Sequence, residues 1–418
     1  MISYELKTGH RVERITLPDH CTVRELKPNR TKETASQEEI CKAALENPMD
    51  AQPLRQLAAG KKRAVIVTSD ITRPMPSKLV LPFILEQLYC AGMTDEQITI
   101  VLGIGSHRKH SSEEKTRLIG ENVVRRLRVI DAGSDGYCRL GTTERGTPVE
   151  IDRTVSEADL RICLGNVEFH YFAGFSGGAK AILPGVSSPA AIRSNHRHMM
   201  EPTAAVGVLE GNPVREDMEE AVQRFCPVDF VLNVVLDSEK KILCAAAGHV
   251  VTAHRFLCQY LLKHCCVPLS GKADIVVASL GGAPKDMNLY QLQKGLENAE
   301  KAAKNGGVII LIGACQEGFG NDIFEQWMCR NESPQDTLER LQREFVLGGH
   351  KAAAICKVLL KHRVLLVSDL PEIVIRRTKL EPFSSAQEAL DHALACKGRD
   401  AQILLIPEAG STIPLAES

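Results

Sequence analysis

Short apolar runs rich in β-branched residues alternate with longer amphipathic segments along most of this 418-residue chain. The runs have the length of strands, and the segments between them carry apolar residues at the spacing of a helix with one buried face. This alternation is typical of α/β folds, in which helices connect parallel strands and cover the sheet. Six runs are therefore predicted as strands of a first sheet, at residues 63–69, 97–103, 126–131, 159–165, 230–237 and 242–248.

A second group of strands begins after a boundary near residue 267. A helical pattern at 249–264 leads into the sequence CVPLSGKAD, whose proline and glycine mark a linker. Beyond it we predict strands at 273–279, 307–313 and 362–368 and helices near 288–304, 335–346 and 348–361. The run at 401–410 suits either sheet. We therefore predict an α/β protein of two domains with mostly parallel sheets: an N-terminal domain at 1–267, to which the tail 403–418 can return, and a C-terminal domain at 268–402.

The composition excludes several classes of function. With a net charge of −1 and 25% charged residues, the chain offers no electrostatic attraction for nucleic acid or an anionic membrane. Its start lacks the apolar core of a signal peptide and its apolar runs are too short to span a bilayer, so we expect a cytoplasmic protein that binds small molecules. The 14 cysteines are scattered without a CxxC pair, and we interpret most of them as small buried hydrophobic residues.

The loops after three predicted strands carry polar residues that suit chemistry. Asp70 and Arg73 follow the first strand, His107 follows the second and His170 follows the fourth. Ligands of open α/β sheets bind beyond the carboxyl ends of the strands, so we expect a shared site at one sheet edge. Taken alone, Asp70 also suits a helix cap with Arg73 as its ion-pair partner. His110 is interpreted as incidental, because it neighbours the better-placed His107.

A glycine-rich loop, GFSGGAKAILPG at 174–185, surrounds Lys180 with Gly174, Gly177 and Gly178. It resembles a phosphate-binding loop but has alanine on both sides of the lysine, so the hydroxyl that would bind magnesium is missing. The glycines would let a ligand approach the backbone. Two functions stay open for the lysine, a charge for a phosphate or an amine for covalent attachment to an electrophile, beside the plain alternative of a solvated turn lysine.

Two further motifs carry polar residues. SNHRHM places His196 and His198 on a predicted helix, and NLYQLQKG places Tyr290, Gln291 and Lys294 near the start of the second domain. His198 is interpreted as incidental beside His196. The chain has no HExxH motif and no paired cysteine ligands, which leaves a single metal-binding histidine with non-protein ligands as the open metal hypothesis.

Five motifs in this order and spacing, DITRP, GSHR, FHYFAGFSGGAKAILPG, SNHRHM and NLYQLQKG, resemble those of the lactate racemase family. The resemblance spans essentially the whole chain. Members of this family use a nickel-pincer nucleotide, which is a pyridinium-3-thioamide-5-thiocarboxylic acid mononucleotide that carries nickel. The resemblance implies an isomerase that inverts C2 of a 2-hydroxy acid by reversible hydride transfer to this cofactor, through a 2-keto acid intermediate. It also implies cofactor-maturation enzymes as partners.

The resemblance implies a role for each matching residue. Lys180 would be the covalent attachment point of the cofactor, as a thioamide, and His196 would be the protein ligand of nickel. His107 and His170 would be the acid/base pair, and Arg73 would bind the substrate carboxylate.

The resemblance also implies where the remaining polar residues act. Asp70 would hydrogen-bond or orient one of these catalytic groups. Tyr290, Gln291 and Lys294 would complete the pocket from the second domain. The active site would then lie in the cleft between the two domains, which is a usual place for a ligand.

Departures from the family pattern limit what the resemblance says about the substrate. Phe175 stands where many relatives have tyrosine, and Ser106 occupies a position that is often threonine. Some relatives also place an aromatic side chain of the second domain against the substrate; no residue can be assigned to that position here, since Trp327, the only tryptophan, is not at an obvious place. The alternative function is a non-catalytic or differently metallated protein that binds a phosphorylated small molecule through Lys180 and the glycine-rich loop.

Overall fold

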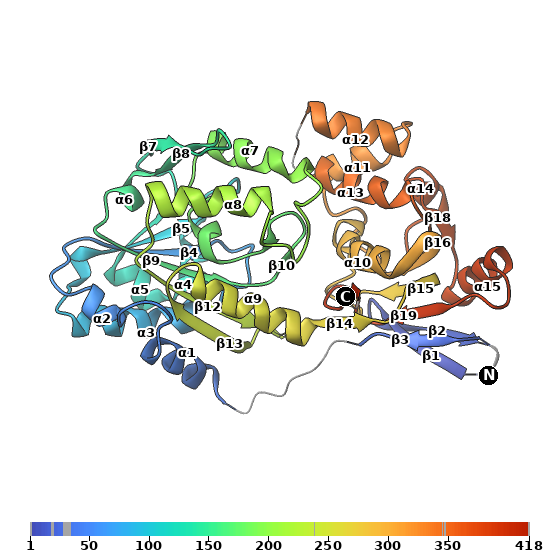
Figure 1. Cartoon of the computed structure of the whole chain (residues 1–418), viewed down its shortest axis with the longest axis horizontal. Helices are drawn as coiled ribbons and strands as arrows, with labels where there is room; N and C mark the ends of the chain where they lie inside the picture. The colour runs from blue at the N-terminus through green and yellow to red at the C-terminus, as the bar shows by residue number, and fades with distance from the viewer. Residues whose placement is uncertain are drawn as a thin grey trace. The chain divides into compact units, whose positions relative to one another are not determined.

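The computed structural model describes residues 2–17, 21–27, 35–237, 239–344, 346 and 348–416. The chain forms two compact units, each built around its own sheet. The central unit is Lys32–Lys263, and the composite unit combines Met1–Thr31 with His264–Ser418. In Figure 1 the composite unit therefore contains both the blue strands of the chain's start and its orange and red end.

The central unit holds a six-stranded sheet in the order β13-β12-β9-β4-β5-β6. Neighbouring strands are parallel except β13, which runs antiparallel to β12. All six predicted strands are present, as β4 (Ala64–Ser69), β5 (Ile98–Gly103), β6 (Arg128–Asp131), β9 (Leu160–Asn166), β12 (Phe230–Leu236) and β13 (Ile242–Gly248). The central strands are buried on both faces, as expected for apolar runs without polar alternation.

Helices connect these strands, as the alternating pattern predicted. Side-chain caps define several helix starts: Ser36 and Ser111 each form a capping box, and the Asn212 side chain accepts two backbone N–H groups. The helices of this unit are α1 (Gln37–Glu46), α2 (Leu54–Leu57), α3 (Ser77–Cys90), α4 (Ser112–Ile119), α5 (Glu121–Arg126), α6 (Arg153–Ser156), α7 (Pro189–Arg197), α8 (Pro213–Glu220) and α9 (Thr252–Cys265). Two hairpins complete it, β7 (Tyr137–Thr142) with β8 (Pro148–Asp152) and β10 (Phe169–His170) with β11 (Gly174–Phe175).

The composite unit holds a second six-stranded sheet in the order β18-β17-β16-β15-β19-β3, and its pairs are all parallel. Its strands are β3 (Val23–Glu25), β15 (Ala273–Ser279), β16 (Ala303–Ile312), β17 (Arg363–Val367), β18 (Glu381–Phe383) and β19 (Ile403–Ile406). Two further pairs are β1 (Ile2–Thr8) with β2 (Arg11–Leu17) and β14 (Cys266–Leu269) with β20 (Ile413–Ala416). Its helices are α10 (Leu289–Ala302), α11 (Asp322–Met328), α12 (Pro334–Arg343), α13 (Gly349–Leu359), α14 (Glu372–Arg376) and α15 (Ala386–Lys397).

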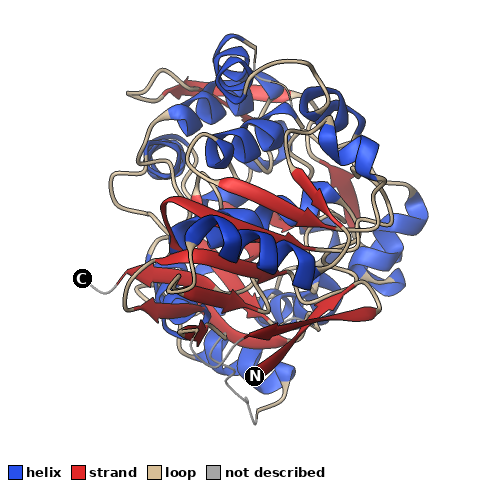
Figure 2. Cartoon of the chain, turned by 90° about the vertical axis from the view of Figure 1, so that its right-hand side faces the viewer, coloured by secondary structure: helices blue, strands red, loops and turns tan. Residues whose placement is uncertain are grey.

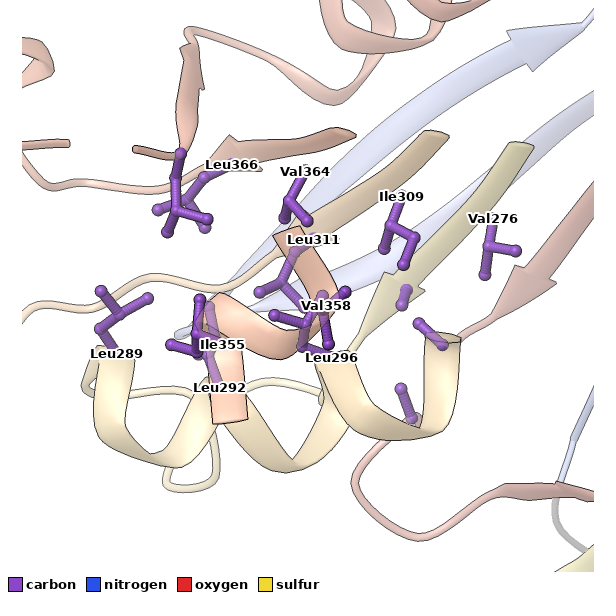
Figure 3. Packing of buried hydrophobic residues seen from close by; sticks show 14 of the residues in the cluster. Val276, Leu289, Leu292, Leu296, Ile309, Leu311, Ile355, Val358, Val364 and Leu366 are labelled. Carbon is purple, nitrogen blue, oxygen red and sulfur yellow. The ribbon is translucent and has the colours of Figure 1, made fainter. Parts of the chain in front are cut away.

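Apolar side chains pack on both faces of this second sheet. Figure 3 shows one layer, in which Leu292 of α10 and Ile355 of α13 pack in one cluster with Leu311 of β16. The opposite layer contains α15 and the β1–β2 hairpin, which buries Leu6 and Ile15 completely. Figure 2 shows the strands of this unit side by side with helices over them. Each sheet therefore has a core of its own.

The division of the chain differs from the predicted one at both ends. Residues 1–31, which we assigned to the domain at 1–267, lie in the composite unit, where β3 pairs with β19. The tail from residue 403 also stays in this unit, since β19 lies between β15 and β3 and β20 pairs with β14. The reason is that apolar periodicity identifies a strand but not the sheet that accepts it. The run ILLI in β19 is buried along its whole length and needs a strand on each side.

The cysteines and helices agree with the compositional analysis. All fourteen cysteines are unpaired thiols and half of them are buried, so the interpretation as small hydrophobic residues holds for those seven. Burial raises the pKa of Cys41 and Cys226 to about 11, which keeps these thiols protonated at neutral pH. Within the described residues, no helix is long and apolar enough to cross a membrane.

Candidate active site

Four of the predicted site residues gather at one edge of the central sheet. β9, β4 and β5 are adjacent and parallel, so their carboxyl ends meet at that edge. The loop after β4 carries Asp70 and Arg73, the loop after β5 carries His107, and His170 lies in β10 just after β9. The expectation that these loops share an edge is confirmed.

Asp70 and His107 form a hydrogen-bonded pair. Nδ1 of His107 lies 2.5 Å from Oδ2 of Asp70, whose other oxygen accepts a hydrogen bond of 2.8 Å from the Thr72 hydroxyl. Burial by itself would raise the pKa of Asp70, but the hydrogen bonds from His107 and Thr72 outweigh it and hold that pKa below its ordinary value. Ionised Asp70 accepts the Nδ1–H of His107, which leaves Nε2 of this partly exposed ring as a proton acceptor. Asp70 therefore orients His107. It does not cap α3, because this helix begins after Pro76 without a hydrogen bond from a side-chain cap.

His110, which we interpreted as incidental, anchors the loop that carries Asp70. Its Nδ1 donates to Oδ1 of Asp131 over 2.5 Å, and its Nε2 accepts the backbone N–H of Ile71 over 3.1 Å. Lys115 holds the other oxygen of Asp131 at 2.9 Å. The ring is buried, so His110 fixes the backbone beside Asp70 and has a structural role.

His170 lies among cationic side chains, and its pKa is depressed. Burial lowers the pKa of His170 well below its ordinary value, and the nearby Lys180 and Arg73 lower it further. Its Nδ1 accepts the backbone N–H of Ala173 over 3.3 Å, so the proton of the neutral ring belongs on Nε2. The two histidines therefore present opposite groups at Nε2: His107 a lone pair and His170 an N–H.

The ring of Phe172 joins three of the predicted site residues. It packs edge-on against His170 at 4.5 Å and against His196 at 4.9 Å between ring centroids. Nζ of Lys180 lies 5.6 Å from the same centroid, within the range of a cation–π contact. Sequence reasoning gave Phe172 no role, because a buried aromatic residue carries no pattern that separates a core position from a catalytic one.

Lys180 lies in the short turn Gly178–Ala181 of the glycine-rich loop. Burial lowers the pKa of its amine well below the ordinary value, Arg215 and Arg73 lower it further, and Glu168 opposes them. Within the described part of the chain, Lys180 forms no ion pair, and its Nζ faces the Phe172 ring. A neutral lysine amine is the form that attacks an electrophile.

Three glycines of this loop are required by the protein's own packing. Gly174, Gly177 and Gly178 all have positive φ, at +73°, +74° and +58°. A Cβ on Gly174 would lie 2.0 Å from the carbonyl oxygen of Val208, and one on Gly177 would lie 2.7 Å from Oδ1 of Asn233. On Gly178 it would meet a histidine ring of α9. We expected these glycines to admit a ligand; each instead faces neighbouring protein atoms, and contact between them and a cofactor stays a prediction.

Buried polar side chains that sequence reasoning missed hold the loop in place. Arg215 of α8 donates to two of its carbonyl oxygens, those of Phe175 and Gly177, and to that of Ala173 just before it. Nε2 of His254 donates to the carbonyl oxygen of Ser176, and Oδ1 of Asn233 accepts the N–H of Gly178, each over 2.8 Å. The sequence contains a signal for the burial of His254, because this residue lies on the apolar face of α9. None existed for Arg215, which the sequence does not distinguish from an exposed helix arginine.

His196 lies on α7, and its neighbour orients its ring. Asn195 donates through Nδ2 to Asp217 over 2.8 Å, so its Oδ1 accepts the Nδ1–H of His196 over 3.1 Å, and Nε2 is the acceptor nitrogen of the ring. His198 pairs with Glu201 at 3.0 Å, in keeping with an incidental role. In the residues that the structure describes, no group of three or more histidine, cysteine, aspartate or glutamate side chains could hold a metal ion.

The remaining predicted residues lie on α10 of the composite unit. Tyr290, Gln291 and Lys294 occupy its first turns. Tyr290 packs edge-on against Phe324 at 5.5 Å between ring centroids, Gln291 is half-buried and Lys294 is exposed. Trp327 is buried in the core of the same unit, which accounts for the absence of an obvious substrate role. Contact of the three α10 residues with a substrate stays a prediction.

Models of two protein domains match this chain. The lactate racemase N-terminal domain matches residues 8–207, and the lactate racemase C-terminal domain matches residues 269–413. A lactate racemase of Thermoanaerobacterium thermosaccharolyticum is 35% identical, with 99% of each chain covered. A lactate racemase of Lactiplantibacillus plantarum is 33% identical, with 89% of this chain and 90% of that protein covered.

Solved structures agree with these matches. The lactate racemase apoprotein of Thermoanaerobacterium thermosaccharolyticum superposes with a TM-score of 0.88 at 34% identity, over 99% of this chain and 100% of that chain. A protein of Thermotoga maritima superposes with a TM-score of 0.63 at 18% identity, over 91% of this chain and 98% of that chain, and this likeness concerns the fold alone.

Proposed function

The chain belongs to the lactate racemase family, and from this premise we propose that it is an isomerase that inverts C2 of a lactate-like 2-hydroxy acid. One observation carries the proposal: His107 follows β5 and His170 follows β9, which are two parallel strands of one sheet, and the two rings present opposite groups at Nε2. Inversion needs such a pair, because one face of the substrate requires a proton acceptor and the other a proton donor.

Hydride chemistry suits these residues better than carbanion chemistry. Loss of the C2 hydrogen as a proton would leave a carbanion beside an ionised carboxylate, and a histidine of ordinary pKa, about 6.5, is a weak base for that task. The nickel-pincer nucleotide, when bound, would supply a reversible acceptor for the C2 hydride. The histidines then need only move a proton at the hydroxyl oxygen, and a planar 2-keto acid lies between the two enantiomers.

Each residue of the sheet edge takes one role in this proposal. Nε2 of His107 accepts the hydroxyl proton of one enantiomer while ionised Asp70 holds its Nδ1–H. When the bound anionic substrate offsets the surrounding cations, His170 takes up a proton from solvent at Nδ1. Its Nε2–H then transfers to the carbonyl oxygen as the other enantiomer forms, which leaves a neutral ring. The exposed guanidinium of Arg73 binds the substrate carboxylate with its planar fork, which fixes that end while the carbonyl group turns.

The central unit fits the proposed cofactor by the chemistry of its donor groups. Lys180 offers an amine whose pKa lies well below the ordinary value, chiefly because it is buried, and this amine suits covalent attachment. His196 offers Nε2 with Nδ1 tied to Asn195, which is how a metal-binding histidine is usually held. We propose that Lys180 would hold the nucleotide as a thioamide, formed between its amine and a thiocarboxylic acid group with loss of water. His196 would bind the nickel, after cofactor-maturation enzymes have supplied the nucleotide and the metal.

The substrate pocket is proposed to include residues of α10. Gln291 and Lys294 offer an amide and an ammonium group for the hydroxyl and carboxylate of a 2-hydroxy acid, and the partly buried Tyr290 packs against the core of the same unit. Gln291→Ala and Lys294→Ala are expected to raise KM at least about tenfold, since each loses a hydrogen bond to a charged or polar group. Unchanged KM for both variants would remove α10 from the proposed pocket.

The proposal is tested with protein from a host that makes the cofactor. We expect an intact-mass increase of cofactor size that maps to Lys180, one nickel per chain, and interconversion of D- and L-lactate in a chiral assay. A panel of enantiopure 2-hydroxy acids then identifies the preferred substrate. Racemisation in D₂O should leave C2 undeuterated, whereas rapid labelling of C2 would indicate a carbanion. Unmodified, inactive protein that binds a phosphorylated compound would instead support the non-catalytic alternative.

A further inference from the structure

Helix α8 holds the backbone that leads to Lys180. The guanidinium of Arg215 donates to the carbonyl oxygen of Ala173 over 3.3 Å, to that of Gly177 over 3.3 Å, and to that of Phe175. Asn212, the N-cap of the same helix, donates through Nδ2 to the carbonyl oxygen of Phe172 over 2.9 Å. Two side chains of one helix turn therefore bind four carbonyl groups of the segment 172–177.

The same helix holds the segment that carries His196. Asp217, two residues after Arg215, accepts the Nδ2–H of Asn195 over 2.8 Å, and Thr143 donates to its other oxygen over 2.5 Å. Asn195 also donates to the carbonyl oxygen of Val214 over 3.1 Å. Because Oδ1 of Asn195 accepts from His196, this chain of bonds runs from α8 to the histidine ring.

These connecting groups are completely enclosed. Asn195, Asn212, Arg215 and Asp217 each have 0% of their surface exposed. Among the described residues no carboxylate bonds to Arg215, and an enclosed guanidinium that binds carbonyl oxygens is costly to keep in the fold and needs every one of its hydrogen bonds. Apolar side chains would be enough to fill this buried space. The polar side chains found there indicate that the positions of the segments they bind must be fixed.

We propose that α8 is the positioning element for cofactor attachment, in which Asn212 and Arg215 set the loop of Lys180 and Asp217 sets the helix of His196. This inference rests on the proposed function, since it assumes that Lys180 and His196 hold one bound group. A single rigid helix then fixes the separation between the attachment point and the metal ligand. Such fixed geometry is what a rigid cofactor with two attachment points requires.

The charge of Arg215 has a second effect on Lys180. Burial comes first in lowering the pKa of Lys180, and Arg215 adds more than Arg73 does, while Glu168 acts in the opposite direction. Of the other titratable groups nearby, His170 and His254 have pKa values well below the ordinary value, chiefly because they are buried, and so stay neutral. Removing the charge of Arg215 should therefore raise the pKa of the attacking amine.

The test uses the full chain with four substitutions. Arg215→Gln removes both the charge and the planar guanidinium group, whereas Arg215→Lys keeps the charge alone. Asp217→Ala removes the acceptor of the Asn195 hydrogen bond, and Asp217→Asn restores an acceptor. Arg224→Gln is the matched control, because this arginine follows α8 but is 53% exposed. Thermal unfolding first identifies the variants that fold.

The first readout needs no cofactor. Trace acetic anhydride is added to apoprotein across a pH range, and mass spectrometry compares the Lys180 peptide with the peptide of an exposed lysine. We expect the midpoint for Lys180 to rise by about 1 pH unit in Arg215→Gln and to stay unchanged in Arg215→Lys and in the control. A Lys180 midpoint that is the same in folded Arg215→Gln as in the wild type would overturn the electrostatic part.

The second readout measures assembly in a cofactor-making host. Both Arg215 variants should carry at least about tenfold less adduct at Lys180, since lysine cannot bind several carbonyl groups in one plane. Asp217→Ala should bind nickel about tenfold more weakly at normal adduct content, and Asp217→Asn should recover it. Normal adduct in folded Arg215→Lys, or normal nickel binding in Asp217→Ala, contradicts the proposal.

If the Arg215 variants do not fold, Asn212→Ser tests the proposal in their place, because serine still caps α8 but cannot reach the Phe172 carbonyl. This variant should also carry less adduct at Lys180, and normal adduct in it would contradict the proposal. Wild-type protein without adduct would contradict the proposed function. The labelling of apoprotein would still test whether the charge of Arg215 lowers the pKa of Lys180.

Discussion

The hydrogen bond between Asp70 and His107 gives the sharpest test of the acid/base assignment. Asp70→Asn keeps the size of the side chain but removes the charge that accepts Nδ1–H over 2.5 Å. The amide can also turn its NH₂ group toward Nδ1, which would move the ring proton to Nε2. His107 would then present a donor where the proposed reaction needs an acceptor.

The size of the effect follows from the bond that is lost. A hydrogen bond to a charged group contributes about 1.5–3 kcal/mol. At about 1.36 kcal/mol per factor of ten, loss of this bond in the transition state lowers kcat/KM by about 10- to 150-fold. If the ring proton also moves, the loss approaches about 10⁴-fold, as it does when the orienting carboxylate of a hydrolytic triad becomes an amide.

The assay measures initial rates from both enantiomers by chiral chromatography, with cofactor-loaded protein. Because the two enantiomers have equal free energy in solution, kcat/KM must fall by the same factor in both directions. The adduct at Lys180 and the nickel content should not change, since the carboxylate of Asp70 accepts hydrogen bonds from Thr72 and His107. Asp95→Asn serves as the control, because this aspartate lies in an exposed ion pair with Arg126. Activity within twofold of the wild type, with intact adduct, would refute the role of Asp70.

Three further predictions concern the fold around the site. Because Asp70 has a depressed pKa in the folded protein, the stability advantage of wild type over Asp70→Asn should be complete above about pH 4, the ordinary pKa of aspartate, and should shrink as the pH falls below it, as urea unfolding would measure. Gly174→Ala should lower the free energy of unfolding by about 3 kcal/mol, because its Cβ would strike the Val208 carbonyl oxygen, whereas Gly60→Ala, also at positive φ but with open space around it, should cost only about 1 kcal/mol. His110→Ala should cost about 2 kcal/mol by leaving Asp131 without one of its partners, and amide exchange at Ile71 should accelerate; normal protection there would contradict the anchoring role.

The sheets and the acid/base loops could be predicted because their signals are local. A buried parallel strand is a continuous apolar run, and its carboxyl end lies at a common edge with its neighbours. Asp70, His107 and His170 follow such runs directly, so their meeting follows from strand order alone. Their partners needed more than strand order: the sequence left open whether Asp70 caps a helix beside Arg73 or bonds to one of the catalytic groups, and it did not single out His107.

The supporting residues could not be predicted because their signals are not local. Arg215 lies 35 residues beyond Lys180 in sequence, on a short helix, and the sequence does not distinguish it from an exposed helix arginine. Phe172 and His254 are ordinary core residues until the loop around them is known. The glycines of the loop were noticed, but the atoms that exclude a side chain there come from Val208 and Asn233, which no spacing rule connects to them.

The way the two sheets divide the chain sets an order of events during synthesis. The central unit is one continuous stretch, Lys32–Lys263, so the loops with both histidines and Lys180 can fold as soon as that stretch has left the ribosome. The composite unit has to wait, because β3 pairs with β19 and some 380 residues separate them. Until β19 is made, β3 lacks the strand with which it pairs. Attachment of the proposed cofactor at Lys180 would therefore not have to wait for the residues of Ile403–Ile406, and a chain cut short before them would expose unpaired strand edges to aggregation and proteolysis.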